Sequence, residues 1–139
     1  MQMGRILAID YGRKRTGLAV TDSLKIIANA LQTVDTATLK EFLQKYFLQE
    51  DVEAIVVGKP YTKNFETNDI EKDIEQFIVW LNEKFPTKSI HRIDERFTSK
   101  MATQAILASG VNKKTRQQKE IVDRVSATII LQTYLEMQP

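Results

Sequence analysis

The 139-residue sequence contains no cysteine, one histidine, five glycines and three prolines. The absence of cysteine excludes disulfide bonds, thiolate zinc sites and cysteine nucleophiles. The single histidine, His91, excludes a metal site built on two histidines and any serine–histidine pair that does not use it. The sequence also lacks an apolar run long enough to cross a bilayer, and Met1 to Gly4 lead into an apolar strand without a signal-peptide pattern. We therefore expect a cytoplasmic protein that does not associate with membranes.

The composition is that of one folded domain. Hydrophobic residues make up 42% and charged residues 27% of the chain, whereas a disordered chain has fewer apolar residues and a larger charge imbalance. The length suits a single domain, residues 1–139, and is short for two. A net charge of +2 does not by itself identify a nucleic-acid-binding protein. The basic residues are unevenly distributed, however, and many fall in one stretch: Arg92, Arg96, Lys100, Lys113, Lys114, Arg116, Lys119 and Arg124.

Apolar periodicity predicts an α/β domain with a mixed sheet. Three short strands, at residues 6–9, 17–21 and 26–28, are expected to open the chain as an antiparallel meander, with Gly12 to Arg15 forming the first turn. Helical spacing predicts helices at residues 39–47, 70–81, 98–109 and 121–135. Two further strands are predicted at residues 52–57 and 89–93, and a basic loop at residues 111–119.

Three acidic residues stand at the ends of predicted elements. Asp10 closes the first strand, Glu95 closes the fifth with Asp94 beside it, and Asp123 lies in the first turn of the last helix. If the first and fifth strands approach one another, these carboxylates can meet at one edge of the sheet. Clustered carboxylates repel unless a cation neutralises them, and oxygen ligands suit Mg²⁺ or Mn²⁺. Two such ions about 4 Å apart can activate water and stabilise a leaving 3′ oxygen in phosphodiester hydrolysis.

Each of these residues also has a purely structural explanation. An aspartate such as Asp10 is common in turns after strands. Asp94 and Glu95 could form a solvated pair with Arg96, and Asp123 could favour the N-terminal end of a helix through the helix dipole. Periodicity alone therefore leaves metal catalysis and ordinary structural roles both open.

Three other features admit a functional or a structural interpretation. Asp10 and Gly12 followed by Gly17 match part of a phosphate-binding loop of actin-like ATPases and sugar kinases. That function needs a second glycine-bearing loop, and the chain has only one Asp-x-Gly sequence. The basic loop before Asp123 is either a solvated loop or a surface that holds phosphates beside the metal. His91 falls in the middle of a strand, which favours a packed or surface histidine over a general base.

Four segments in order along the chain resemble the bacterial YqgF family, whose members are also called pre-16S rRNA nucleases or Holliday junction resolvase-like proteins. The matching segments are residues 9–22 (IDYGRKRTGLAVTD), 56–60 (VVGKP), 94–99 (DERFTS) and 121–132 (IVDRVSATIILQ). The resemblance implies an RNase H-like fold, in which a five-stranded mixed sheet with an antiparallel second strand is flanked by helices. It also favours Glu95 over Asp94 as the functional residue.

The resemblance implies that Asp10, Glu95 and Asp123 are the catalytic and metal-binding residues of a two-metal nuclease, with Asp10 bridging two Mg²⁺ or Mn²⁺ ions. The expected partner is structured RNA, and the expected reaction is 5′-end processing of pre-16S rRNA in ribosome biogenesis. Resolution of four-way DNA junctions, which would need a homodimer rather than a monomer, is an alternative, as is a non-catalytic nucleic-acid- or ribosome-binding protein. The expected nucleic-acid contacts are Arg15, Arg96, Lys113, Lys114, Arg116 and Lys119.

Overall fold

A computed structural model of the chain describes residues 4–60, 69–95 and 119–138, and the side chains of residues 119–125 lie outside the described part. The predicted helix at residues 98–109 and the basic loop up to residue 118 are therefore not among the described residues. The described elements, in chain order, are β1 (Arg5–Asp10), β2 (Arg15–Thr21), β3 (Ala28–Asp35), the 3-10 helix η1 (Thr36–Thr38), α1 (Leu39–Gln49), β4 (Val52–Lys59), α2 (Ile70–Lys84), β5 (Ser89–Asp94) and α5 (Lys119–Met137).

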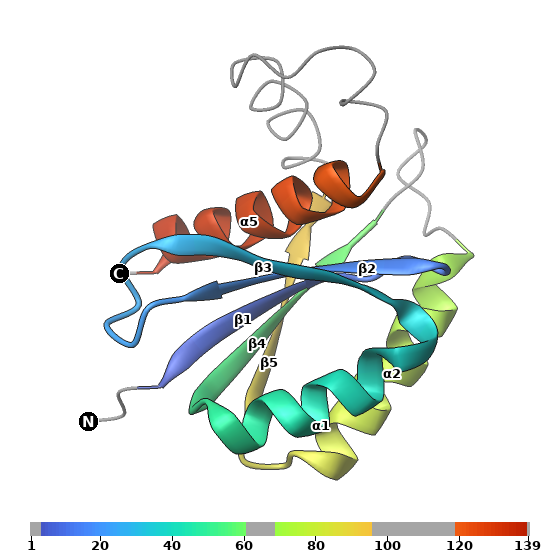
Figure 1. The fold of residues 1–139 in the computed structure, drawn as a ribbon, viewed down its shortest axis with the longest axis horizontal. Helices are drawn as coiled ribbons and strands as arrows, with labels where there is room; N and C mark the ends of the chain where they lie inside the picture. Colours follow the sequence, from blue (N-terminus) through green and yellow to red (C-terminus); the bar gives the residue numbers. More distant parts are fainter. Residues whose placement is uncertain (1–3, 61–68, 96–118, 139) are drawn as a thin grey trace.

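The five strands form one mixed sheet with the spatial order β3-β2-β1-β4-β5. β2 runs antiparallel to both β1 and β3, whereas β1, β4 and β5 run parallel to one another. Figure 1 shows α1 and α2 on one side of the sheet and α5 crossing its other side. The predicted α/β architecture, a five-stranded mixed sheet with an antiparallel second strand and flanking helices, is confirmed. Of the helices in the described ranges, none has the length and apolar character needed to span a bilayer.

The sheet separates two apolar cores of different character. On the side of α1 and α2, β1 contributes the large side chains of Leu7 and Ile9, which are fully buried. On the side of α5, the strands contribute small side chains at several positions, and the helix adds one of its own: Ala8, Ala19, Ala54 and Ala127. Small side chains on both surfaces allow a helix to pack close to a sheet. α5 can therefore lie close to the sheet residues on that face.

Several predicted boundaries were wrong. The third strand runs from Ala28 to Asp35 rather than over residues 26–28. Arg15 begins β2 instead of belonging to the preceding turn. The last helix begins at Lys119, so Lys119 lies in the helix and not in the basic loop, and Asp123 falls beyond the first turn. The helices α1 and α2 and the strands β4 and β5 lie where the periodicity predicts them, with slightly wider bounds.

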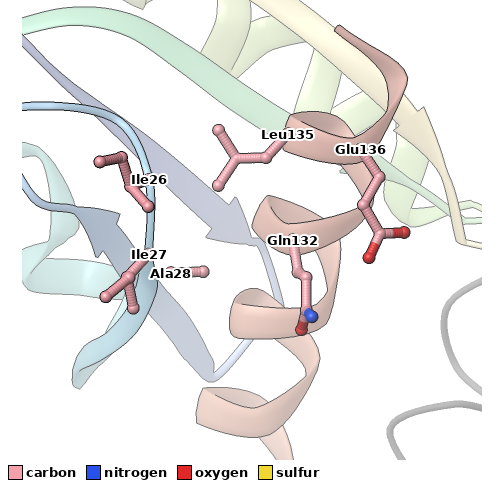
Figure 2. A pocket seen from close by; sticks show the side chains of 6 residues that line it. All are labelled: Ile26, Ile27, Ala28, Gln132, Leu135 and Glu136. Atoms are coloured by element: carbon pink, nitrogen blue, oxygen red, sulfur yellow. The ribbon is translucent and has the colours of Figure 1, made fainter.

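A tight loop explains why the third strand begins late. The Asp22 carboxylate accepts hydrogen bonds from the backbone N–H groups of Ile26 and Ile27, at 2.8 and 2.9 Å. These hydrogen bonds lower the pKa of Asp22. Lys25 adopts a left-handed conformation with φ of 61°, which a strand does not accommodate. The exposed Ile26 and Ile27, together with Leu135 near the end of α5, line an open recess of about 420 Å³ (Figure 2).

A buried ion pair joins α2 to the end of the sheet. Glu71, in the first turn of α2, is only 3% exposed. Its carboxylate accepts hydrogen bonds from both terminal nitrogens of Arg92 on β5, at 2.7 and 3.1 Å. The same guanidinium donates to the carbonyl oxygens of Val57 and Gly58 on β4, at 3.1 and 3.0 Å. Arg92 therefore connects the ends of two parallel strands to one helix.

Replacing the buried carboxylate should destabilise the fold strongly. In Glu71→Ala, Arg92 loses its bidentate partner, and breaking a buried pair costs about 3–5 kcal/mol. The matched control is Lys45→Ala, which breaks the exposed Glu41–Lys45 pair on α1, whose side chains are 69% and 73% exposed. Exposed pairs of this kind contribute about 0.5 kcal/mol or less. Urea unfolding of both variants measures the difference, and equal losses would contradict a stabilising role for Glu71.

Candidate active site

The carboxyl ends of β1, β4 and β5 lie at one edge of the sheet because these strands are parallel. The register pairs Ile9 with Val57 and Lys59 with Asp94, so the three strands end at nearly the same level. Asp10 is the last residue of β1, and Glu95 directly follows β5. Asp10 and Glu95 therefore lie at the same edge, on the two sides of β4.

Both acidic residues also belong to the face of the sheet that α5 covers. Side chains alternate between the faces along a strand. Asp10 lies two residues after Ala8, and Glu95 lies two residues after Ile93, and both of these apolar residues pack in the core beneath α5. A Cβ atom added at Gly58 would come within 2.9 Å of both the Glu95 carboxyl carbon and Cδ1 of Ile130 on α5. Glu95 thus lies over Gly58, beside the helix.

The carboxyl groups of Asp10 and Glu95 are hydrogen-bonded to one another. Neighbouring strands are about 4.8 Å apart, so β1 and β5, with β4 between them, are separated by roughly 10 Å. The two side chains can meet across that distance because the residue between them on β4 is Gly58, which has no side chain. A hydrogen bond between two carboxyl groups requires that one of them keep its proton and donate it to the other.

The electrostatic surroundings of Glu95 favour its protonated form. Burial raises the pKa of Glu95, and the nearby carboxylates of Glu71 and Asp94 raise it further, whereas the hydrogen bond with Asp10 and the charge of Arg92 act in the opposite direction. Two close carboxyl groups in such a place either share a proton or bind a cation. Their oxygen-only donor set fits Mg²⁺ or Mn²⁺.

The third predicted ligand, Asp123, lies in α5 at a position whose side chain is outside the described part. Asp123 precedes Ile130 by seven residues, which is close to two helical turns, so the two residues lie on the same face of α5. Ile130 packs against Gly58. Across the described ranges, three His, Asp or Glu side chains do not come together as a metal-binding group. The participation of Asp123 stays a prediction.

One predicted nucleic-acid contact can be placed near the acidic pair. Gly17 on β2 is directly opposite Asp10, and directly opposed residues of antiparallel strands project to the same face. Arg15 precedes Gly17 by two residues and so lies on that face, one step further toward the carboxyl edge. Lys119 begins α5, but its side chain is outside the described part, and the remaining predicted contacts are outside the described residues altogether: Arg96, Lys113, Lys114 and Arg116.

Sequence reasoning assigned no role at this edge to three residues that organise it: Gly58, Glu71 and Arg92. Glu71 had a recognisable signal, because it precedes Ile74 by three residues and therefore falls on the apolar stripe of its helix. The importance of Gly58 depends on which strands flank β4, and no local pattern reveals that. His91, to which no role was assigned, packs its ring 5.2 Å from that of Tyr134.

Comparison with known sequences gives one consistent result. A family model described as "RuvX: Holliday junction resolvase" matches residues 4–137. A Porphyromonas gingivalis protein named "Putative pre-16S rRNA nuclease" is 54% identical over 134 residues, which cover 96% of this chain and 97% of that protein. A Flavobacterium johnsoniae protein of the same name is 50% identical over 133 residues and 96% of each chain.

Comparison with solved structures supports the fold. Thermus thermophilus RuvC in complex with a Holliday junction substrate superposes with a TM-score of 0.57, covering 96% of each chain at 16% sequence identity. A second T. thermophilus RuvC structure gives a TM-score of 0.51 at 14% identity. At these identities the likeness concerns the RNase H-like fold alone. The sequence matches over almost the whole chain show that this protein belongs to the RuvX family of Holliday junction resolvase-like proteins, the YqgF family that its motifs resemble.

Proposed function

We propose that this chain is a metal-dependent nuclease that hydrolyses phosphodiester bonds during 5′-end processing of the 16S ribosomal RNA precursor in the cytoplasm. The single observation that carries the proposal is the hydrogen-bonded pair of Asp10 and Glu95 over Gly58, at the carboxyl edge of the sheet. The choice of RNA rests on the names of relatives that are at least 50% identical over nearly the whole chain.

In this proposal Asp10, Glu95 and Asp123 would hold the Mg²⁺ or Mn²⁺ ions. When bound, such ions polarise the scissile phosphate and lower the pKa of a water molecule that attacks it. Cation binding would favour the ionised form of Asp10 and Glu95, since a carboxylate oxygen binds a cation in its ionised form. Arg15, on the same face, is suited to orient a phosphate group beside them. The basic residues that lead into α5, including Lys119, would hold the neighbouring phosphates.

A four-way DNA junction is the second candidate substrate, because the matching family model is described as a Holliday junction resolvase. Symmetric cutting of a junction would require a homodimer with two sites, whereas rRNA processing can be carried out by a monomer. A non-catalytic nucleic-acid-binding protein is the remaining alternative. A cleavage assay that presents both substrates to the same protein distinguishes these possibilities.

The Asp10→Asn variant should lose nuclease activity by more than about 100-fold, because a neutral amide cannot replace a metal-binding carboxylate. Purified protein is incubated with precursor 16S rRNA or junction DNA in Mg²⁺, Mn²⁺ or EDTA, and products are resolved on gels. Asp51→Asn, an equivalent change just before β4 at the opposite edge of the sheet, serves as the control and should retain activity. Equal cleavage by the wild type and Asp10→Asn would point to a contaminating nuclease. Binding without cleavage would favour a non-catalytic role.

A methyl group at Gly58 should disrupt the site more than the fold. In Gly58→Ala the new Cβ would lie 2.9 Å from the Glu95 carboxyl carbon and displace it. Displacement of a catalytic group by about 1 Å can cost 100-fold in rate. Gly4→Ala is a matched control, because its Cβ would be equally crowded at 2.9 Å from Cβ of Glu53, at the other edge of the sheet. We expect comparable losses of stability in urea but a loss of cleavage only in Gly58→Ala. Equal activities would refute the role of Gly58.

Glu95→Gln should change the pH dependence of stability in a metal-dependent way. The pKa of Glu95 is raised in the folded state. Its contribution to the free energy of unfolding is therefore fully present below the pKa of the unfolded chain, about 4.3, and is lost as pH rises through the pKa of the folded protein. In EDTA, the stability of Glu95→Gln relative to the wild type should therefore increase from about pH 4 upward and then level off. Saturating Mg²⁺ should stabilise only the wild type, by about 2.7 kcal/mol at 100 times the dissociation constant. Urea unfolding at pH 4–8 tests both; parallel pH profiles in EDTA would count against a buried, protonated Glu95.

A further inference from the structure

A recess of about 380 Å³ lies beside the turn that follows β1, and neither the acidic pair nor the proposed mechanism uses it. Its residues come from the β1–β2 turn, η1, α1 and α2, and they include Tyr11, Arg13, Thr36, Lys40 and Phe77. Its volume falls within the range of about 300–1,000 Å³ that is usual for small-ligand sites. The recess is open to solvent at the carboxyl edge of the sheet.

The inner wall of the recess is aromatic. Phe77 on α2 is only 3% exposed, and the ring of the partly exposed Tyr11 lies above it with centroids 5.3 Å apart. The Trp80 ring also stacks on the ring of Phe77, with centroids 5.9 Å apart and an interplanar angle of 19°. Lys40 lies 5.2 Å above the Trp80 ring. Tyr11 is thus held by packing from one side, and such a fixed ring is a surface on which a planar group can stack.

Cationic groups surround this aromatic wall. The Arg13 side chain is 61% exposed, and Lys40 on α1 is also exposed. Asp73 on α2 lies 3.6 Å from Nε of Arg13. Burial raises the pKa of Tyr11, and the charge of Asp73 raises it further. Arg13 and Lys40 belong to the described residues that line the recess and Asp73 does not, so this lining carries a positive balance. A positive rim around an aromatic wall is the combination by which proteins hold single-stranded nucleic acid.

The turn that forms the edge of the recess is held firmly in place. The Thr36 hydroxyl donates a hydrogen bond of 2.5 Å to the carbonyl oxygen of Gly12. Any side chain at Gly12 would collide with the carbonyl oxygen of Arg15, so the turn requires glycine at this position. The recess is therefore a preformed feature, which reduces the entropy lost when a ligand binds.

The recess and the acidic pair are connected through two adjacent residues at the end of β1: Tyr11 lines the recess, and Asp10 belongs to the acidic pair. Asp10 projects to the α5 face, and Tyr11, the next residue, packs on Phe77 beneath the opposite face. A polynucleotide that crosses the carboxyl edge of the sheet with one phosphate at Asp10 would bring a neighbouring nucleotide to Tyr11. That nucleotide must be unpaired, because a base in a duplex is not free to stack on a protein ring.

We propose that this recess binds one unpaired nucleotide of the RNA substrate next to the scissile phosphate, with the base stacked on Tyr11 and a phosphate held by Arg13 and Lys40. The proposal rests on the proposed nuclease function and adds to it a requirement for single-stranded RNA at the cut.

The single tryptophan of the chain, Trp80, stacks on Phe77 and lies beneath Lys40, so its emission reports changes at these two recess residues. The full-length protein is titrated in EDTA, where RNA stays intact, with a fluorescein-labelled 12-nucleotide single-stranded RNA or with a blunt duplex of the same sequence. Fluorescence anisotropy of the labelled RNA reports binding, and unlabelled RNA is used to follow Trp80 emission. We expect saturable changes in both signals with the single strand, and at least about fivefold weaker binding of the duplex.

Three variants test the proposed contacts. Tyr11→Leu keeps an apolar cover on Phe77 but removes the stacking ring, and it should weaken single-strand binding at least about fivefold. Arg13→Gln and Lys40→Gln should each weaken it and reduce its salt dependence. The control Lys45→Gln removes the same charge from α1 at a side chain that is 73% exposed, and it should bind like the wild type. Thermal unfolding of each variant confirms that it folds.

Several outcomes would overturn the proposal: wild-type affinity in Tyr11→Leu, RNA binding that leaves Trp80 emission unchanged, or equal affinity for duplex and single strand. Binding of free adenosine monophosphate as tightly as the 12-nucleotide RNA would also overturn it and would indicate a small-nucleotide site instead. Since these measurements need no cleavage, their failure is distinguishable from failure of the nuclease proposal, which the Asp10→Asn assay tests separately.

Discussion

The candidate site depends on the absence of a side chain at Gly58 on β4. Asp10 and Glu95 stand on strands that are not neighbours, and they reach one another because Gly58 places no side chain between them. The space over Gly58 also accommodates the side chain of Ile130 on α5, so the glycine sets how closely this helix approaches the sheet. One missing side chain thus determines both the spacing of the carboxyl groups and the position of the helix that carries Asp123.

This arrangement has an electrostatic cost that the surrounding structure limits. Carboxyl groups brought together in a partly buried place favour protonation, and burial raises the pKa of Glu95 in keeping with this. On the opposite face of the sheet, the guanidinium of Arg92 is bound to Glu71 and to the carbonyl oxygens of Val57 and Gly58. Its positive charge acts on Glu95 in the direction that favours ionisation. Arg92 therefore fixes the strand ends that carry the site and partly offsets the negative charge of its carboxylates.

The two faces of the sheet contribute differently to the proposed function. The α5 face, with its small alanine side chains, presents the acidic pair and Arg15, whereas the α1 and α2 face presents the aromatic recess around Tyr11. Alternation along β1 assigns consecutive residues to these two faces. A substrate that contacts both must pass over the carboxyl edge of the sheet, which is where β1, β4 and β5 end.

The sequence by itself was sufficient for the architecture and for the residues at the strand ends. The apolar runs and stripes predicted the central strands, the α1 and α2 helices and the last helix, because burial against a core imposes the periodicity of each element. The four motifs identified the family. The third strand was misplaced because Ile26 and Ile27, which have strong β propensity, are held in a loop by hydrogen bonds to the Asp22 carboxylate, and propensity does not register such a bond.

Only the tertiary structure decided how these residues come together. Strand order placed β4 between β1 and β5 and so made Gly58 the residue beneath the carboxyl pair. It also brought Glu71 to Arg92 and packed Tyr11 on Phe77, pairs whose members are far apart in the chain. Local periodicity reports which face of an element is buried, but the neighbours that an element meets depend on the order of strands in the sheet. For that physical reason the chemistry-bearing residues were readable in the sequence, and their mutual contacts were not.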